Sequence, residues 1–198
     1  ITPHRIRANV LSVDSGSPEL MHMVLDTGYA AAHFTNSGKE AWRIEIGPKP
    51  IADLGLFGNW LLIGGTDFYV RSIGAHTGRI AWQTPVGGPV VRKPQVSRNR
   101  VFAITSEGVM HCLKLDNGAF LWPKGLRDCT DFITADDDLV VAERPPRRIV
   151  IADARTGEEI VTTGPKKYKF ALADPSDGLF CLVYKSGDIA CFQARAEK

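Results

Sequence analysis

The segment Phe68–Trp82, FYVRSIGAHTGRIAW, decides the fold of this 198-residue chain. Two β-prone runs, Phe68 to Ile73 and Arg79 to Trp82, flank the tripeptide His76-Thr77-Gly78. A glycine that can adopt a positive φ between two such runs is typical of a tight β-hairpin. The segment therefore predicts two antiparallel strands, with a tryptophan four residues after the turn glycine.

The same pattern recurs along the chain at a nearly constant period. Trp42, Trp82 and Trp122 are 40 residues apart, and each follows a glycine by four positions. The glycines of this series are Gly38, Gly78, Gly118 and Gly157. In the fourth unit Val161 stands where the tryptophan would be. Self-similarity at this period indicates one supersecondary unit that is repeated.

Each repeat holds more than a hairpin. A β-rich run lies upstream of each one, at Met21 to Leu25, Trp60 to Gly64, Val101 to Thr105, Leu139 to Ala142 and Leu179 to Tyr184. A shorter apolar segment precedes that run in most units, as at Val90-Val91, Phe132-Ile133 and Phe170 to Leu172. Four strands in each unit without a helical period predict an all-β protein, a β-propeller of about five four-stranded blades. We expect one propeller domain over residues 1–198, with repeats at 10–49, 50–89, 90–129, 130–168 and 169–198 plus 1–9.

The fifth unit is short by one strand. One register runs through all five units, at Gly28, Phe68, Gly108, Arg147 and Gly187. After Gly187 the chain has room for the strand Asp188 to Phe192 and ends before another. The segment His4 to Ala8 falls where a final strand belongs, so we expect it to pair with the fifth blade and close a ring, which removes exposed sheet edges. The alternative is that these blades form part of a larger ring.

Three of the units carry a recognisable signature. IGAHTGRIAW, LKLDNGAFLW and FTNSGKEAW resemble the pyrroloquinoline-quinone-type (PQQ-like) propeller repeat, whose blades carry an Asp-Ala-x-Thr-Gly-x-x-x-Trp-like motif. The fourth unit keeps its first part as Asp153-Ala154-Arg155-Thr156-Gly157. WD40 repeats differ, because their Trp-Asp pair precedes the turn. The resemblance covers essentially the whole chain and implies that each tryptophan packs between adjacent blades, where Val161 makes a smaller contact.

The resemblance also bears on function. Quinone-dependent dehydrogenases of this type resemble eight-bladed rings with a vicinal cysteine pair, a calcium site and a catalytic aspartate, whereas this sequence has no adjacent cysteines. Non-catalytic relatives, among them the barrel-assembly lipoprotein of bacterial outer membranes and sensor domains attached to kinases, use the propeller to hold partners. We therefore expect a non-catalytic protein-interaction scaffold or sensor module with an unidentified protein partner. The alternatives are a fragment of a quinone-dependent dehydrogenase and a small-ligand sensor that uses the central channel.

Composition narrows the partner class. The formal net charge of +2, from 24 Lys and Arg against 22 Asp and Glu, does not imply a polyanion, so we do not expect nucleic acid. No apolar run approaches the roughly 20 residues of a membrane-spanning helix, and the first residues lack the apolar core of a secretory signal. The sequence predicts a soluble chain. Its start at Ile1 suggests a processed product or an excised domain.

Four cysteines occur in the chain, at Cys112, Cys129, Cys181 and Cys191. None has the CxxC or Cys-x-His spacing of a zinc or redox motif. Cys112 and Cys191 each follow an equivalent glycine by four residues, so they occupy the same position in two non-adjacent units, which argues against their pairing. We expect small buried residues with free thiols, which favour a reducing compartment without establishing it.

Other chemistry-bearing residues show no site motif. The five histidines are scattered without metal-ligand spacing, so we expect surface or turn roles for them. The run Asp136-Asp137-Asp138 lacks the further oxygen ligands of a calcium loop and predicts a solvated turn. No catalytic triad, nucleophile elbow or phosphate-binding loop is recognisable. The sequence therefore assigns no catalytic, cofactor-binding or metal-binding residue.

The most distinctive departures from the repeat are basic. Arg144-Pro145-Pro146-Arg147-Arg148 replaces a glycine-containing hairpin, and Lys166-Lys167-Tyr168-Lys169 follows in the next connection. The candidate patch consists of Arg144, Arg147, Arg148, Lys166, Lys167 and Lys169. On neighbouring blades these side chains would receive an acidic protein, a phosphorylated group or nucleic acid. The alternative is that they only keep exposed loops soluble.

Overall fold

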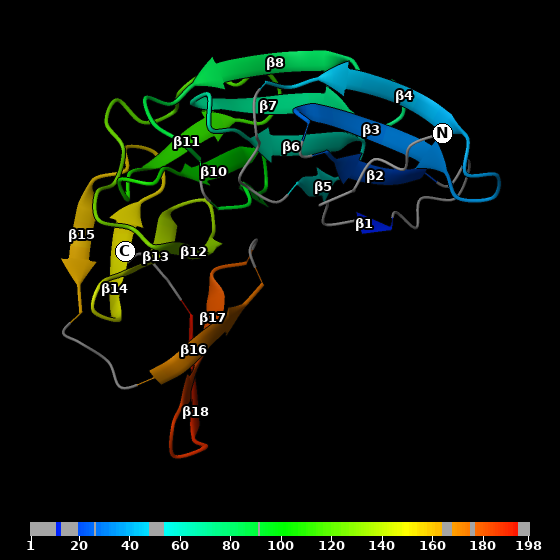
Figure 1. The fold of residues 1–198 in the computed structure, drawn as a ribbon. Helices are drawn as coiled ribbons and strands as arrows, with labels where there is room; N and C mark the ends of the chain where they lie inside the picture. The colour runs from blue at the N-terminus through cyan, green and yellow to red at the C-terminus, as the bar shows by residue number, and fades with distance from the viewer. Residues whose placement is uncertain are drawn as a thin grey trace. The chain divides into compact units, whose positions relative to one another are not determined.

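The computed structural model describes residues 11–12, 20–25, 27–47, 54–90, 92–163, 168–174 and 177–193. These residues form eighteen strands in five antiparallel sheets, and no helix long and apolar enough to cross a membrane occurs among them. In every sheet the strands follow one another in chain order (Figure 1). The all-β prediction is therefore confirmed.

The chain divides into two compact units, Ile1–Pro94 and Gln95–Lys198. The first unit holds two four-stranded sheets. The first sheet consists of β1 (Leu11–Ser12), β2 (Leu20–Val24), β3 (Tyr29–Phe34) and β4 (Glu40–Glu45). The second sheet consists of β5 (Gly55–Phe57), β6 (Trp60–Gly64), β7 (Tyr69–Gly74) and β8 (Ile80–Pro85).

The second unit holds the other three sheets. The third sheet consists of β9 (Gln95–Ser97), β10 (Arg100–Ile104) and β11 (Met110–Lys114). The fourth consists of β12 (Asp131–Ala135), β13 (Leu139–Arg144), β14 (Arg148–Asp153) and β15 (Glu159–Thr162). The fifth consists of β16 (Tyr168–Ala173), β17 (Leu179–Tyr184) and β18 (Ile189–Gln193). The fifth sheet thus shows three strands in the described residues, and the proposed closing segment His4 to Ala8 lies outside them.

Two left-handed positions recur in every complete unit and set the turns. The hairpin glycines Gly38, Gly78, Gly118 and Gly157 have φ values of 67, 66, 71 and 73°. In the second register Gly28, Gly108 and Gly187 are left-handed, and so are the non-glycine residues Phe68, with φ 73°, and Arg147, with φ 58°. The spacing found in the sequence therefore reflects a backbone requirement of the turns.

A tryptophan of one sheet packs on the hairpin glycine of the next sheet. A Cβ atom on Gly78 would lie 2.7 Å from the Trp42 ring, and one on Gly157 would lie 2.5 Å from the Trp122 ring. The ring nitrogen of Trp42 donates a hydrogen bond to the Ala75 carbonyl at 2.8 Å. Only glycine leaves room for this contact, which explains why the two residue types share one period.

Apolar side chains fill the space between the fourth and fifth sheets. The buried cluster there consists of Ile133, Leu139, Val141, Ile149, Tyr168, Phe180 and Leu182. The Tyr168 ring and its neighbours on β17 belong to the fifth sheet, and the others to the fourth. This contact orients β16 beside β12, where the candidate site lies.

The third sheet departs from the expected four strands. Its first strand is Gln95–Ser97 and not Val90-Val91; Val90 instead donates its backbone N–H to the Gly65 carbonyl at 3.1 Å, and Val91 lies outside the described residues. The expected strand after Gly118 is reduced to two isolated bridges, Leu113 with Phe120 and Met110 with Leu126. The proline at 123 has no N–H to donate, so a regular ladder cannot continue through this segment.

Two of the four cysteines correct the expectation of free thiols. Cys181 and Cys191 are directly opposed on β17 and β18 and form a disulfide, with Cα atoms 3.9 Å apart. In the third sheet the residue opposite Cys112 is Phe102, so the equivalent position cannot form a disulfide. Cys112 and Cys129 are buried and free, as expected.

Candidate protein-interaction site

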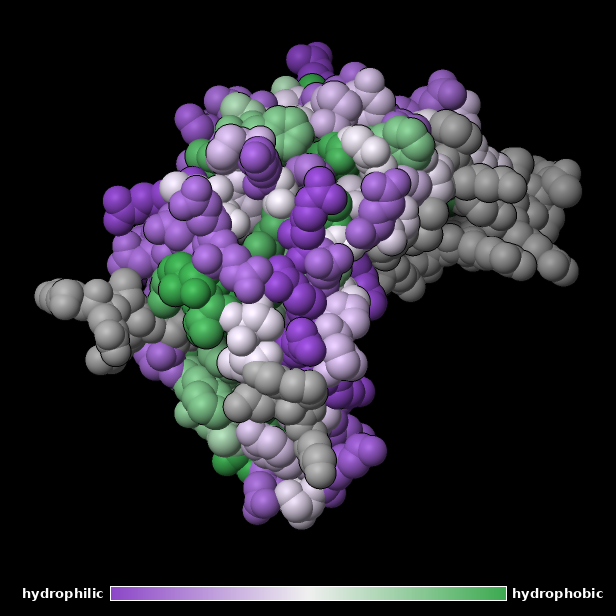
Figure 2. Space-filling model, turned by 90° about the vertical axis from the view of Figure 1, so that its left-hand side faces the viewer, coloured by the Kyte–Doolittle hydropathy of each residue, from purple (hydrophilic) through white to green (hydrophobic). Residues whose placement is uncertain are grey.

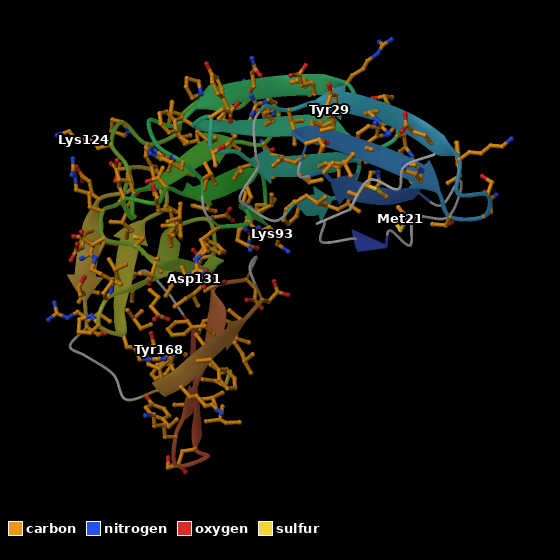
Figure 3. All side chains as sticks on the ribbon, in the orientation of Figure 1. Met21, Tyr29, Lys93, Lys124, Asp131 and Tyr168 are labelled. Carbon is orange, nitrogen blue, oxygen red and sulfur yellow. A yellow bond between two sulfur atoms is a disulfide. The ribbon has the colours of Figure 1, made fainter. Side chains whose placement is uncertain are left out.

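A groove of about 510 Å³ lies between the first strands of the fourth and fifth sheets; we call it the β16 groove. Its lining residues are Gln95, Asp131, Phe132, Ile133, Glu143, Arg147, Lys169, Phe170, Ala171, Leu172 and Ala173. Most of them come from β12 and β16, which are the end strands of their sheets. In Figure 3 the labels Asp131 and Tyr168 mark the first residues of β12 and β16.

The charged residues of the β16 groove come from the beginnings of β12 and β16, the end of β13 and the turn that follows it. Asp131 pairs across β12 and β13 with Glu143. Arg147 donates from Nη1 to the carbonyls of Tyr168, at 3.1 Å, and Lys169, at 2.6 Å. Its guanidinium also lies over the Tyr168 ring, 5.5 Å from the centroid. Two acidic and two basic residues thus line one groove, without a net charge.

Tyr168 is buried beside Arg147. Burial raises the pKa of its phenol well above the ordinary value, and the neighbouring Glu143 carboxylate raises this pKa further. The phenol therefore stays neutral at physiological pH. Because the ring packs among the apolar residues between the two sheets, Tyr168 holds β16 in place.

The apolar part of the groove follows β16 away from the charges. Phe170 and Leu172 are 42% and 56% exposed. Ala171 faces the other side of the strand and packs against the cluster that contains Ile133. The exposed large side chains offer apolar contact area to a partner, and the small side chains beside them leave space for the partner's own side chains.

The structure redistributes the basic patch expected from the sequence. Arg144 turns inward: its side chain is 14% exposed, and its Nη1 lies 2.8 Å from the Glu159 carboxylate. Its Nη2 donates to the Arg127 carbonyl at 2.9 Å. This ion pair and the Thr162 hydroxyl hold the pKa of Glu159 below its usual value, with the hydroxyl as the larger cause. Arg144 is therefore a structural residue and not a free cation.

The other patch residues divide between the groove and the surface. Arg147 and Lys169 line the β16 groove. Arg148 is exposed and has no ion pair within the described residues. Lys166 and Lys167 lie outside the described residues. Two of the six patch residues thus line a groove that also contains two carboxylates, and the role of the patch in binding a partner stays a prediction.

The histidine and aspartate expectations have mixed outcomes. His76 lies in the expected turn, but His22 is buried, with 1% of its surface exposed. The correction has a structural cause, because the Nε2–H of His22 donates to the Ala75 carbonyl of the second sheet at 2.8 Å. Asp137 and Asp138 lie between β12 and β13, where the turn was expected, and form ion pairs with Arg98 and Arg155. No group of three potential metal ligands occurs among the described residues.

Other large apolar side chains are exposed on β15 and on the fifth sheet. They are Ile160, Val161, Leu179, Ile189 and Phe192. Figure 2 looks at the molecule from the side that lies to the left in Figure 1 and shows green hydrophobic residues at the surface there. Sequence reasoning missed these exposed side chains and the groove, because both depend on which sheet faces are covered by a neighbouring sheet.

Comparison with known proteins identifies the repeat. The PQQ-like family described as outer membrane protein assembly factor BamB matches residues 26–167. The curated BamB of Yersinia pestis is 26% identical over 110 residues, which cover 50% of this chain and 28% of that protein. The BamB of Burkholderia pseudomallei is 27% identical over 129 residues, which cover 62% of this chain and 34% of that protein. The matched stretch thus spans about a third of these relatives or less.

A solved structure shows the fold. The crystal structure of BamB from Moraxella catarrhalis superposes with a TM-score of 0.66 at 18% identity and covers 93% of this chain and 63% of that one. Together with the five sheets, this likeness confirms the expected PQQ-like β-propeller fold. The matched length leaves room for more sheets in the relative than the five found here.

Proposed function

Because the chain belongs to the family of the outer membrane protein assembly factor BamB, we propose that it is a non-catalytic scaffold that binds a protein partner in the β16 groove. The curated relatives carry the name of an assembly factor. We accordingly propose that the partner takes part in the assembly of outer membrane proteins.

The observation that carries this proposal is the composition of the groove. Exposed apolar side chains, Phe170 and Leu172, lie next to a charged end that contains both signs. Protein interfaces combine an apolar centre with a polar, charged rim in this way.

Site-specific photo-crosslinking tests the proposal. A photoreactive amino acid at position 173, in the groove, is expected to capture a defined protein in cells that express the whole natural protein. The control carries the same amino acid at position 80, which is exposed on β8 in the first unit. Equal adducts at both positions, or adducts at neither, would overturn the proposal.

A quinone titration addresses the enzyme alternative. The scaffold should produce no absorbance change when pyrroloquinoline quinone and calcium are added together. A saturable change would replace the scaffold with a dehydrogenase fragment. A metabolite panel tests the small-ligand sensor. A compound that raises the unfolding temperature, with the rise abolished by a substitution in the central channel, would favour that alternative.

A further inference from the structure

We propose that the β16 groove binds its partner as an extended segment that adds to the sheet as a new strand beside β16. This inference rests on the proposed function and specifies the class of partner. It follows from the position of the strand edges, the blocked ends of β16 and the balance of charge in the groove.

The groove runs along the edge of a strand. Side chains alternate between the two faces of a β-strand, yet every residue from Lys169 to Ala173 lines the groove. Only a groove along the edge touches consecutive residues. β16 is the end strand of its sheet, and such an edge presents unpaired N–H and C=O groups that can bind another chain.

Both ends of this edge are closed by side chains of the fourth sheet. Arg147 binds the carbonyls of Tyr168 and Lys169. At the other end the Thr134 hydroxyl donates to the Asp174 carbonyl at 2.6 Å. The segment Phe170–Ala173 remains between them, a length of about 13 Å at 3.3 Å per residue. The available edge therefore accommodates about four residues of an added strand.

The side chains next to this edge define what the added strand carries. Ala171 and Ala173 are small and lie on the side of β16 that faces β12, where Phe132 and Ile133 also line the groove. Large apolar side chains at alternate positions of the added strand would fill this space. The opposite side chains would lie beside Phe170 and Leu172 on the outer side of the sheet.

Charge does not select the partner. Asp131 and Glu143 balance Arg147 and Lys169 at the beginning of β16. Recognition therefore rests on backbone hydrogen bonds and apolar contact, and binding should change little with ionic strength. A basic patch that receives an acidic partner would show the opposite, a steep loss of binding in salt.

The test uses a labelled, end-blocked ten-residue peptide of alternating valine and threonine, measured by fluorescence anisotropy with the whole chain. The comparison peptide has the same sequence, with the alternate amides that would pair with β16 methylated. We expect the methylated peptide to bind at least tenfold more weakly, and the unmodified peptide to keep its affinity within about threefold between 50 and 500 mM salt. Equal binding of the two peptides would overturn strand addition.

Matched substitutions locate the binding. Leu172→Asp is expected to weaken the binding of the unmodified peptide at least tenfold. Ile189→Asp makes the same change at another exposed position of the same sheet and should have no effect. Because both side chains are exposed, circular dichroism should show an unchanged fold for both variants. Equal loss in both variants would place the peptide outside the groove and contradict the proposal.

The two proposals fail separately. If neither peptide binds while position 173 still captures a protein in cells, strand addition is wrong and the scaffold function stands. If the peptide binds as expected while no protein is captured, the groove has the inferred chemistry and the scaffold function is wrong.

Discussion

The fourth and fifth sheets carry equivalent residues in opposite environments. Leu139 and Leu179 are 40 residues apart in the same register and are 6% and 41% exposed. Ile149 and Ile189 are likewise 40 residues apart and are 2% and 63% exposed. The fifth sheet covers the first residue of each pair, whereas nothing in the described residues covers the second. The repeat thus places an apolar residue at the same position of each unit. That residue is buried only where another sheet packs against it.

The outermost strands show the same contrast. Trp122 follows the third sheet and is 2% exposed, because it packs on Gly157 and donates to the Ala154 carbonyl at 3.0 Å. Val161 occupies the equivalent position on β15 of the fourth sheet and is 46% exposed. Residue type follows the environment here, since a valine exposes less apolar area than a tryptophan would.

The largest expected effect concerns the fourth strand expected for the fifth sheet, which is not among the described residues. If residues 4–8 supply it, deletion of residues 1–9 removes the hydrogen-bonded partner of β18. The midpoint of thermal unfolding should then fall by about 10 °C or more, since each kcal/mol corresponds to about 2–4 °C in a chain of this size. Differential scanning calorimetry measures this midpoint. An unchanged value would show that the fifth sheet does not depend on the first residues.

Trp122→Ala should have the next largest effect. Loss of a buried tryptophan at a contact between two sheets costs about 3–5 kcal/mol. The matched variant Val161→Ala removes an exposed side chain at the equivalent position and should cost less than about 1 kcal/mol. Urea unfolding measures both. A similar cost for the two variants would mean that Val161 is covered in the whole protein, and the contrast between the sheets would disappear.

The variants Ile149→Ala and Ile189→Ala compare equivalent positions of the fourth and fifth sheets. Truncation of the buried isoleucine should cost about 2–4 kcal/mol, and truncation of the exposed one no more than about 0.5 kcal/mol. The unfolding free energy of each variant in urea provides the measurement. If the full-length natural protein shows a large cost at both positions, another sheet covers the fifth one there.

The disulfide of the fifth sheet gives a smaller effect. Cys181–Cys191 closes a loop of 10 residues, so its removal should cost about 2–3 kcal/mol in the chain-entropy description. A reductant should destabilise the natural sequence and leave the stability of Cys191→Ser unchanged.

Burial raises the pKa of Cys112 and Cys129 to about 12, so a thiol reagent at pH 8 should label neither in the folded chain. Rapid labelling of four thiols without reductant would contradict the assignment.

Much of the fold could be predicted because each hairpin needs a left-handed residue, and that need leaves a visible period. The strands Trp60–Gly64 and Leu179–Tyr184 match the expected runs residue for residue. The disulfide could also have been predicted, since the position opposite Cys191 follows from the same register. The β16 groove could not be predicted, because it forms between two strand edges of different sheets. The inward position of Arg144 was not predictable for a related reason: its guanidinium binds a carboxylate that sequence spacing does not reveal.

The smallest expected effect concerns His22, a polar residue of the first sheet at a position where other sheets have apolar residues. Leu62, Phe102 and Val141 are buried and apolar at the position where the first sheet has His22. Burial is the main cause that lowers the pKa of His22 below 6.5, and the nearby His76 lowers it slightly. The unfolded chain therefore binds a proton more readily, so this residue reduces stability as the pH falls below about 6.5.

His22→Leu restores the apolar type of the other sheets and tests this pH dependence. The Ala75 carbonyl keeps its hydrogen bond from Trp42 in this variant, so no buried acceptor is left unpaired. Near pH 7.5 the two proteins should unfold at similar temperatures. Between pH 6.5 and 5 the midpoint of the natural sequence should fall relative to that of His22→Leu, because only the former must bury a histidine that its unfolded state prefers to protonate. Parallel curves over this range would show that His22 is not a source of the pH dependence, and the first sheet would then behave like the apolar ones.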